Sequence, residues 1–102
     1  MVSTAQIEEK IKDVIDPELG VDIVSLGLIY KISVSPSGIV HILMTLTSPG
    51  CPLAGVFGSM VKDSLRSIDG LDVDKNVSVE LTFDPPWTPE MMSEETRAEL
   101  GF

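Results

Sequence analysis

Apolar side chains near the amino terminus recur at the spacing of one helical face. They fall at i, i+4, i+7 and i+8, as Ile7, Ile11, Val14 and Ile15. Ser3 followed by Gln6 forms a capping-box pattern, which predicts that the helix begins just after Ser3. The residue before a proline is disfavoured in the helical region, so we expect this helix to run up to Pro17 and end there.

Two alternating segments with a turn between them predict a β-hairpin. In residues 28–35 every second side chain is apolar, namely Leu28, Tyr30, Ile32 and Val34. In residues 39–47 the same alternation puts on one face Val40, Ile42, Met44 and Leu46. Pro36-Ser37-Gly38 lies between the segments and is a turn signal, so we expect antiparallel strands. Residues 77–83 also alternate and predict a third strand, whose neighbour in the sheet the pattern leaves open.

The longest apolar stripe predicts a second helix, and a third helix is expected at the carboxyl end. The stripe consists of Leu53, Val56, Phe57, Met60, Val61, Leu65 and Ile68. Pro52 suits the first turn of that helix and Gly70 its stop. Thr88-Pro89-Glu90 combines an N-cap, a first-turn proline and an acid that favours a helix start. The order α-β-β-α-β-α predicts an α+β fold, a two-layer α/β sandwich with helices on one face of a small sheet.

Length, charge and cysteine count exclude several classes of protein. The 102 residues predict one domain, residues 1–102, with one modest core. The formal net charge of −9 argues against nucleic acid and anionic membranes as partners, and it favours a basic protein partner. Residues 26–30 and 39–44 are the densest apolar stretches and are far shorter than a membrane span. A single cysteine excludes an intrachain disulfide and fits a reduced, cytoplasmic compartment.

Cys51 is the first candidate for chemistry. It follows a predicted strand and precedes a predicted helix, where backbone N–H groups and the helix dipole favour an anion. A thiol at such a position ionises more readily, and the thiolate is both a nucleophile and a metal ligand. Gly50 allows a ligand to approach the backbone closely. The alternative is a small buried apolar side chain that only caps the helix.

Other polar side chains are weaker candidates. Asp16-Pro17-Glu18 puts two carboxylates around a proline, where they could act as metal ligands or as an acid–base pair, or simply form a polar helix exit. Thr47 and Ser48 bring hydroxyl groups close to Cys51 along the chain, although threonine is also common in strands for packing reasons.

Two residues near the carboxyl end have a structural and a functional interpretation. Trp87 lies in the stiff segment Pro86-Trp87-Thr88-Pro89 and could cover the core or serve as an interaction anchor. Arg97 is the single cation among the acids of the last predicted helix, so we expect it to pair with a neighbour three or four residues away.

Four segments in a fixed order carry a resemblance to a known family. They are Asp16-Pro17-Glu18, Val24-Ser25-Leu26-Gly27-Leu28-Ile29-Tyr30, Thr45-Leu46-Thr47-Ser48-Pro49-Gly50-Cys51-Pro52, and Pro86-Trp87-Thr88-Pro89 with Met92-Ser93 and Arg97 through Leu100-Gly101. Together they resemble the small iron–sulfur assembly family, which includes SufT, the PaaD proteins of phenylacetate degradation and the eukaryotic cytosolic iron–sulfur targeting subunits. The resemblance covers essentially the whole chain, although the extra C-terminal cysteines of PaaD are missing.

The resemblance implies a fold, a function and a set of site residues. The fold is that of the iron–sulfur cluster assembly domain, and the function is maturation of iron–sulfur proteins rather than turnover of a metabolite. Cys51 matches the family's motif cysteine, the reactive or iron-ligating thiol. The other residues that match family motifs are Asp16, Glu18, Leu19, Thr47, Ser48, Trp87 and Arg97.

One thiolate cannot hold a cluster alone, because iron–sulfur clusters commonly have four thiolate ligands. A homodimer would supply two thiolates, and Glu18 or external thiols would supply the rest. We therefore expect transient iron or a transient iron–sulfur cluster, held by Cys51 and Glu18, rather than a stable cofactor.

Three functions follow from these residues. The first is an assembly or transfer factor that acts through Cys51 with the iron–sulfur assembly machinery and client apoproteins, and it requires Cys51 to lie close to Asp16 or Glu18. The second is an adaptor without metal, which recruits partners through Trp87, the acidic last helix and the sheet edge. The third is a small thiol enzyme with Cys51 as nucleophile, which ranks last because no oxyanion motif accompanies the cysteine.

Overall fold

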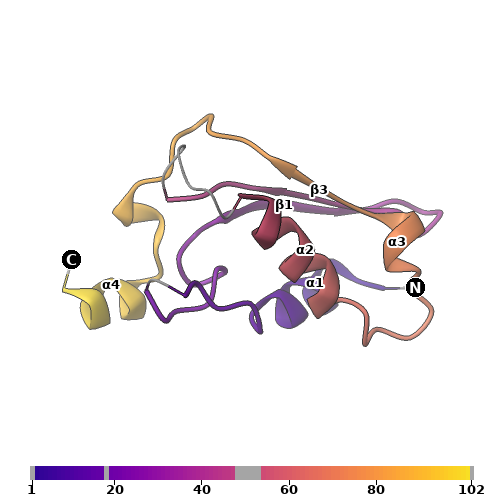
Figure 1. Ribbon diagram of the computed structural model, residues 1–102, viewed down its shortest axis with the longest axis horizontal. Helices are drawn as coiled ribbons and strands as arrows, with labels where there is room; N and C mark the ends of the chain where they lie inside the picture. The colour runs from indigo at the N-terminus through magenta and orange to yellow at the C-terminus, as the bar shows by residue number, and fades with distance from the viewer. Residues whose placement is uncertain (1, 18, 48–53, 102) are drawn as a thin grey trace.

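The elements of the chain follow the predicted order, with two short additions. The computed structural model describes residues 2–17, 19–47 and 54–101, and Figure 1 shows their arrangement. The elements are α1 (Thr4–Ile11), β1 (Ile29–Val34), β2 (Val40–Met44), α2 (Ala54–Ser64), α3 (Val73–Asn76), β3 (Val77–Leu81), the 3₁₀ turn η1 (Pro89–Met91) and α4 (Glu94–Leu100). The short elements α3 and η1 have too few residues to leave a periodic pattern, so the sequence did not predict them.

The three strands form one mixed sheet in the order β1-β2-β3. β1 and β2 pair antiparallel, as the hairpin pattern predicted. β3 pairs with the other side of β2 and runs parallel to it, from Val40 opposite Val77 to Met44 opposite Leu81. A parallel connection requires a crossover, and the chain makes it through α2 and α3.

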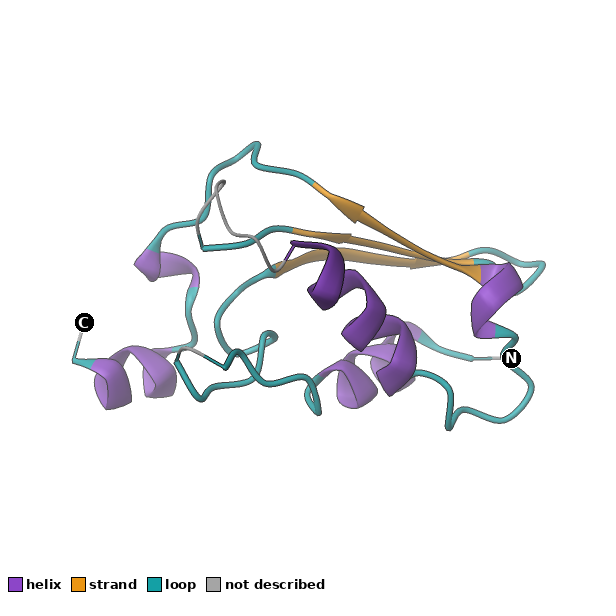
Figure 2. Cartoon of the chain, in the orientation of Figure 1, coloured by secondary structure: helices purple, strands orange, loops and turns teal. Residues whose placement is uncertain are grey.

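The described core lies on the face of the sheet that the helices cover (Figure 2), and loop residues such as Ile23 and Leu26 complete it. Alternate residues of β2, namely Val40, Ile42 and Met44, are fully buried, as the alternation predicted. The helices contribute Ile7 and Ile11 from α1 and, from the α2 region, Phe57, Val61 and Leu65. These contacts confirm the predicted α+β architecture with two layers.

β1 departs from the predicted alternation at Tyr30. The register runs from Ile29 opposite Met44 to Lys31 opposite Leu43, so Tyr30 is an extra residue, a β-bulge. Because a bulge exchanges the two faces of a strand, Ile29 packs against the core in the place expected for Tyr30. The prediction for Tyr30 was therefore wrong, and its side chain is directed to a different contact.

The first helix is shorter than predicted. The predicted capping box is present, with Ser3 Oγ accepting from Gln6 N–H at 3.2 Å. The helix nevertheless ends at Ile11 rather than before Pro17, because Ile15 pairs with Asp22 in an isolated β-bridge. Ile15 consequently leaves the helical face and is 44% exposed.

The other helices also differ from prediction at their ends. α2 stops at Ser64, before the expected stop at Gly70, and Val56 is 49% exposed instead of packing in the core. Thr88-Pro89-Glu90 opens η1, and α4 starts later, at Glu94, where Ser93 Oγ accepts from Thr96 N–H at 3.2 Å.

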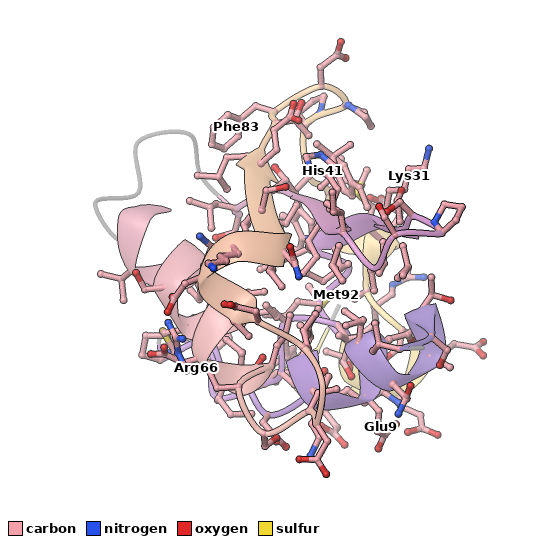
Figure 3. The ribbon with its side chains drawn as sticks, turned by 90° about the vertical axis from the view of Figure 1, so that its right-hand side faces the viewer. Glu9, Lys31, His41, Arg66, Phe83 and Met92 are labelled. Atoms are coloured by element: carbon pink, nitrogen blue, oxygen red, sulfur yellow. The ribbon has the colours of Figure 1, made fainter. Side chains whose placement is uncertain are left out.

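The face of the sheet opposite the helices carries polar side chains. His41 on β2 hydrogen-bonds Ser78 at 2.9 Å and Glu80 at 3.1 Å, both on β3. Figure 3 shows His41 and Lys31 on this side, away from α1 with Glu9 and from Arg66. In the described part of the chain, no helix is long and apolar enough to cross a membrane.

Candidate functional site

One end of the sheet gathers most of the segments that the sequence singled out. β2 and β3 are parallel and finish there, and β1 is antiparallel to β2 and therefore begins there. Thr82 N–H donates to Met44 O at 2.9 Å and Thr45 N–H donates to Leu28 O at 2.8 Å, so the three strands stay joined beyond their last ladder pairs. We call this the site end of the sheet, because ligands of parallel sheets bind beyond the carboxyl ends of strands.

Several predicted site residues lie outside the described residues. These are Glu18, Ser48, Gly50 and Cys51. The expected proximity of Cys51 to Asp16 or Glu18 stays a prediction for the same reason. The structure does describe their neighbours along the chain. Thr47 precedes the cysteine segment, α2 follows it, and Asp16 lies two positions before Glu18.

Thr45 and Thr47 have different environments although they are two residues apart. Thr45 is fully buried, and its hydroxyl donates to Leu46 O at 3.5 Å. Thr47 is exposed at the site end of the sheet. Of the two hydroxyl groups, only that of Thr47 can therefore meet a ligand from solvent.

Asp16 is buried and organises a turn. Its side chain is 6% exposed, and its Oδ1 accepts from Leu19 N–H at 3.2 Å. The backbone carbonyl of the same residue accepts from Gly20 N–H at 2.8 Å. Asp16 therefore holds the backbone of Leu19 and Gly20 in place, and Leu19 is 37% exposed.

A C-terminal strap, residues 85–93, is fastened across the start of β1. Tyr30 donates its hydroxyl to Pro85 O at 2.8 Å and lies 3.5 Å from Met91 Sδ. Trp87 donates its indole N–H to Leu26 O at 2.7 Å, and Ser93 N–H donates to Ser25 O at 2.8 Å. The bulge at Tyr30 makes the first contact geometrically available, so the strap and residues 25–30 form one unit.

Glycine is required where the strap lies closest to the preceding segment. Gly27 has φ +78°, in the left-handed region, and a Cβ atom at this position would lie 2.2 Å from Met91 O. Sequence reasoning did not identify Gly27 or Tyr30 as important residues. Gly27 lies in one of the segments that carry the family resemblance, but a contact between residues 64 positions apart (27 and 91) leaves no local signal in the sequence.

Trp87 is half-buried against the core, and its indole N–H also donates a hydrogen bond. Two substitutions can therefore measure what the hydrogen bond and the packing each contribute to the free energy of unfolding. Trp87→Phe keeps an aromatic ring but leaves Leu26 O without its donor, and we expect it to lower the free energy of unfolding by about 1 kcal/mol. Trp87→Ala also removes packing and should cost about 3 kcal/mol. Urea unfolding followed by circular dichroism measures both. Phe83→Ala, an aromatic 37% exposed outside the strap, is the control and should change little; equal losses for Phe83 and Trp87 would contradict this role.

Arg97 does not form the predicted ion pair with a neighbouring acid anywhere in the described part of the chain. Its Nε is buried, and among the described residues it has no hydrogen-bond partner. The pKa of Glu90 is held below its usual range, first by a hydrogen bond from its own backbone N–H, then by the Thr88 hydroxyl, with the positive charge of Arg97 contributing. Glu90 on the strap is therefore ionised at neutral pH.

No group of three or more His, Cys, Asp or Glu side chains that could hold a metal occurs within residues 2–17, 19–47 and 54–101. Exposed apolar side chains, in contrast, do lie near the site end. Phe83 follows β3 and Val56 lies in the first turn of α2, with exposures of 37% and 49%. The described part of the site end thus offers a hydroxyl group, exposed apolar side chains and a rigid strap.

Comparisons with known proteins agree on one family. A family model described as "Iron-sulfur cluster assembly protein" matches residues 4–79. An Fe-S protein maturation auxiliary factor of Bacillus subtilis is 44% identical over 89% of this chain and 86% of its own length. The factor SufT of Staphylococcus aureus, which has the same description, is 44% identical over 86% of this chain and 97% of its own length.

The fold also matches a solved structure. The crystal structure of a domain of unknown function from Bacillus anthracis superposes with a TM-score of 0.85 at 39% identity, covering 96% of this chain and 91% of that one. The predicted α+β class is therefore confirmed both by the strands and helices and by this likeness.

Proposed function

The chain belongs to the iron–sulfur cluster assembly protein family and takes part in the maturation of iron–sulfur proteins, and we propose that it does so as a non-enzymatic transfer factor acting through Cys51. Iron or an iron–sulfur cluster is then transient cargo rather than a resident cofactor. The proposed partners are the cytoplasmic assembly machinery that supplies the cargo and the apoproteins that receive it.

The observation that carries this proposal is the position of the two chain segments that flank the cysteine. Thr47 is exposed at the carboxyl end of β2, and α2 begins at Ala54. The carboxyl end of β3 lies beside that of β2, which is the position where parallel sheets bind ligands. Residues 48–53 connect this position to α2, which supports Cys51 as the group that meets the cargo.

A single thiolate suits temporary binding. Clusters are commonly held by four thiolates, so one chain supplies at most a quarter of such a set. Two chains in a homodimer would supply two thiolates, and Glu18 or thiols of the donor or client would complete the coordination. Iron or a cluster that one protein ligates only in part transfers easily to a second protein that supplies more ligands.

Anaerobic reconstitution tests the proposal directly. The protein is incubated with ferrous iron and sulfide and passed over gel filtration, and iron content and visible absorption are measured. We expect wild type to retain iron in a dimer-sized peak, Cys51→Ala to retain none, and Glu18→Gln to retain several-fold less. His41→Gln is the matched control, because it removes an imidazole that hydrogen-bonds Ser78 and Glu80 on the face of the sheet away from the helices. Equal iron in wild type and Cys51→Ala would refute a role for the thiol.

A metal-free adaptor in the same pathway is the second candidate, and exposed apolar side chains favour it. Ile15, Leu19, Val56 and Phe83 are each more than a third exposed. Such side chains are available for contacts with client or scaffold proteins. An adaptor would mature clients without retaining iron, so reconstitution and client maturation together separate the two functions.

A further inference from the structure

The sheet ends at β1, and α1 extends beneath that edge. β1 is the first strand in the order β1-β2-β3, so its outer side has no strand partner in the described part of the chain. In Figure 3, Lys31 lies at the right-hand edge of the sheet, and α1 with Glu9 lies below it. An edge strand presents unpaired backbone donors and acceptors, which can pair with another chain.

The strand register identifies the backbone groups that face outward. Ser35 N–H donates to Ile39 O at 2.9 Å, so this is a hydrogen-bonded pair of the antiparallel ladder. Such pairs alternate with non-bonded pairs, and Ser33 opposite His41 is therefore bonded while Ile32 opposite Ile42 is not. The N–H and C=O groups of Ile32 and Val34 consequently point away from β2.

A groove of about 500 Å³ follows this edge. It is lined by Ile29, Tyr30, Lys31 and Ile32 of β1, by Thr4 and Glu8 of α1, and by Val24, Gly27 and Met91. Beyond the bulge, the side chains of Lys31 and Ile32 point to opposite faces of the sheet, so a cavity that contacts both reaches the backbone edge of β1. The inward side chains of an added strand would enter the space between β1 and α1.

We propose that an extended segment of a partner protein adds to the free edge of β1 as a fourth strand. Main-chain hydrogen bonds to Ile32 and Val34 supply affinity, and the groove selects alternate side chains of the segment. Lys31 also lines the groove, but it lies on the side of the sheet away from α1 (Figure 3). Glu8 on the α1 wall and the net charge of −9 therefore favour a segment that carries a lysine or arginine among the apolar residues that face α1.

A second copy of this chain fits the edge less well. Two copies would bring together two net charges of −9. Lys31, the bulge at Tyr30 and Pro36 shorten the stretch available for self-pairing, and these are features that limit edge-to-edge association of identical chains. The negative charge of this chain would attract a basic partner segment, whereas it would repel a second copy of the chain.

The test uses a blocked seven-residue peptide that alternates threonine with inward valine, lysine and valine, added to the isotope-labelled full chain. We expect amide hydrogen exchange of Ile32 and Val34 to slow at least tenfold, while Lys31 and Ser33, already bonded to β2, change little. An analogue with N-methylated backbone amides keeps the side chains and loses the donors, and it should bind at least tenfold more weakly.

Charge reversal supplies a matched pair of variants. Glu8→Lys should reverse the preference, so that a peptide with glutamate in place of lysine binds better. Glu9→Lys is the control, since Glu9 neighbours Glu8 on α1 but pairs with Lys12 and does not line the groove. Protection of Ile32 that appears without peptide and grows with protein concentration would show a second copy at the edge and overturn the proposal. Peptide-induced changes spread over α1 and α4 would show unspecific charge attraction and overturn it too. The assay contains no iron, so its outcome is independent of Cys51.

Discussion

Replacing Cys51 with serine is expected to abolish the transfer of iron or a cluster to a client protein. The measurement is the activity regained by a purified apo-enzyme that requires a four-iron cluster, incubated anaerobically with the reconstituted chain. Serine has nearly the size of cysteine, but its hydroxyl does not ionise to a thiolate that could bind iron. We therefore expect activation to fall at least tenfold, to the level reached with free iron and sulfide.

Two controls separate loss of chemistry from loss of fold. The melting temperature of Cys51→Ser should match that of wild type, and His41→Gln should activate the client normally. If Cys51→Ser also supports full maturation in cells, the transfer function is wrong and the adaptor function is favoured. Glu95→Lys with Glu99→Lys, on the exposed acidic side of α4, should then impair maturation instead.

The parts of the fold that follow from local patterns could be predicted from the sequence. The capping box at Ser3, the hairpin around Pro36 and the buried face of β2 each depend on residues within a few positions of one another. The parallel pairing of β3 with β2 does not, because two strands joined by a long crossover leave no signal of their partner. The errors at Ile15 and Val56 have a related origin, since an apolar residue can match a helical spacing and still face solvent.

For the candidate site, the sequence predicted which residues matter better than it predicted which residues contact one another. The sequence marked Asp16 and Trp87 as chemically interesting, and the structure gives both a hydrogen bond that organises the backbone. No pattern in the sequence indicated that the segments around Gly27 and Trp87 touch, although both segments carry the family resemblance. Tyr30 was misassigned because a bulge depends on the pairing of two strands, and a single strand's alternation cannot reveal it.

Adding a single methyl group at Gly27, where the strap lies closest to the preceding segment, should destabilise the protein strongly. Gly27→Ala would put a Cβ atom 2.2 Å from Met91 O and 2.7 Å from Met91 C, distances that only movement of the backbone can relieve. The left-handed φ of +78° adds a conformational cost for alanine. We expect the free energy of unfolding to fall by about 3 kcal/mol, a large part of the stability of a small domain.

Gly20→Ala isolates the steric part of this effect. Gly20 has a similar φ of +69°, but an added Cβ would meet nothing within 4 Å. The substitution should therefore cost only the conformational share, about 1 kcal/mol. Urea unfolding gives both free energies, and the fluorescence of Trp87, the single tryptophan, reports on the strap in the native state. A red shift in Gly27→Ala but not in Gly20→Ala would mean that the strap has been lifted from residues 25–30. Equal losses in the two variants would mean that the strap yields without cost, and the rigidity assigned to the site end would then be wrong.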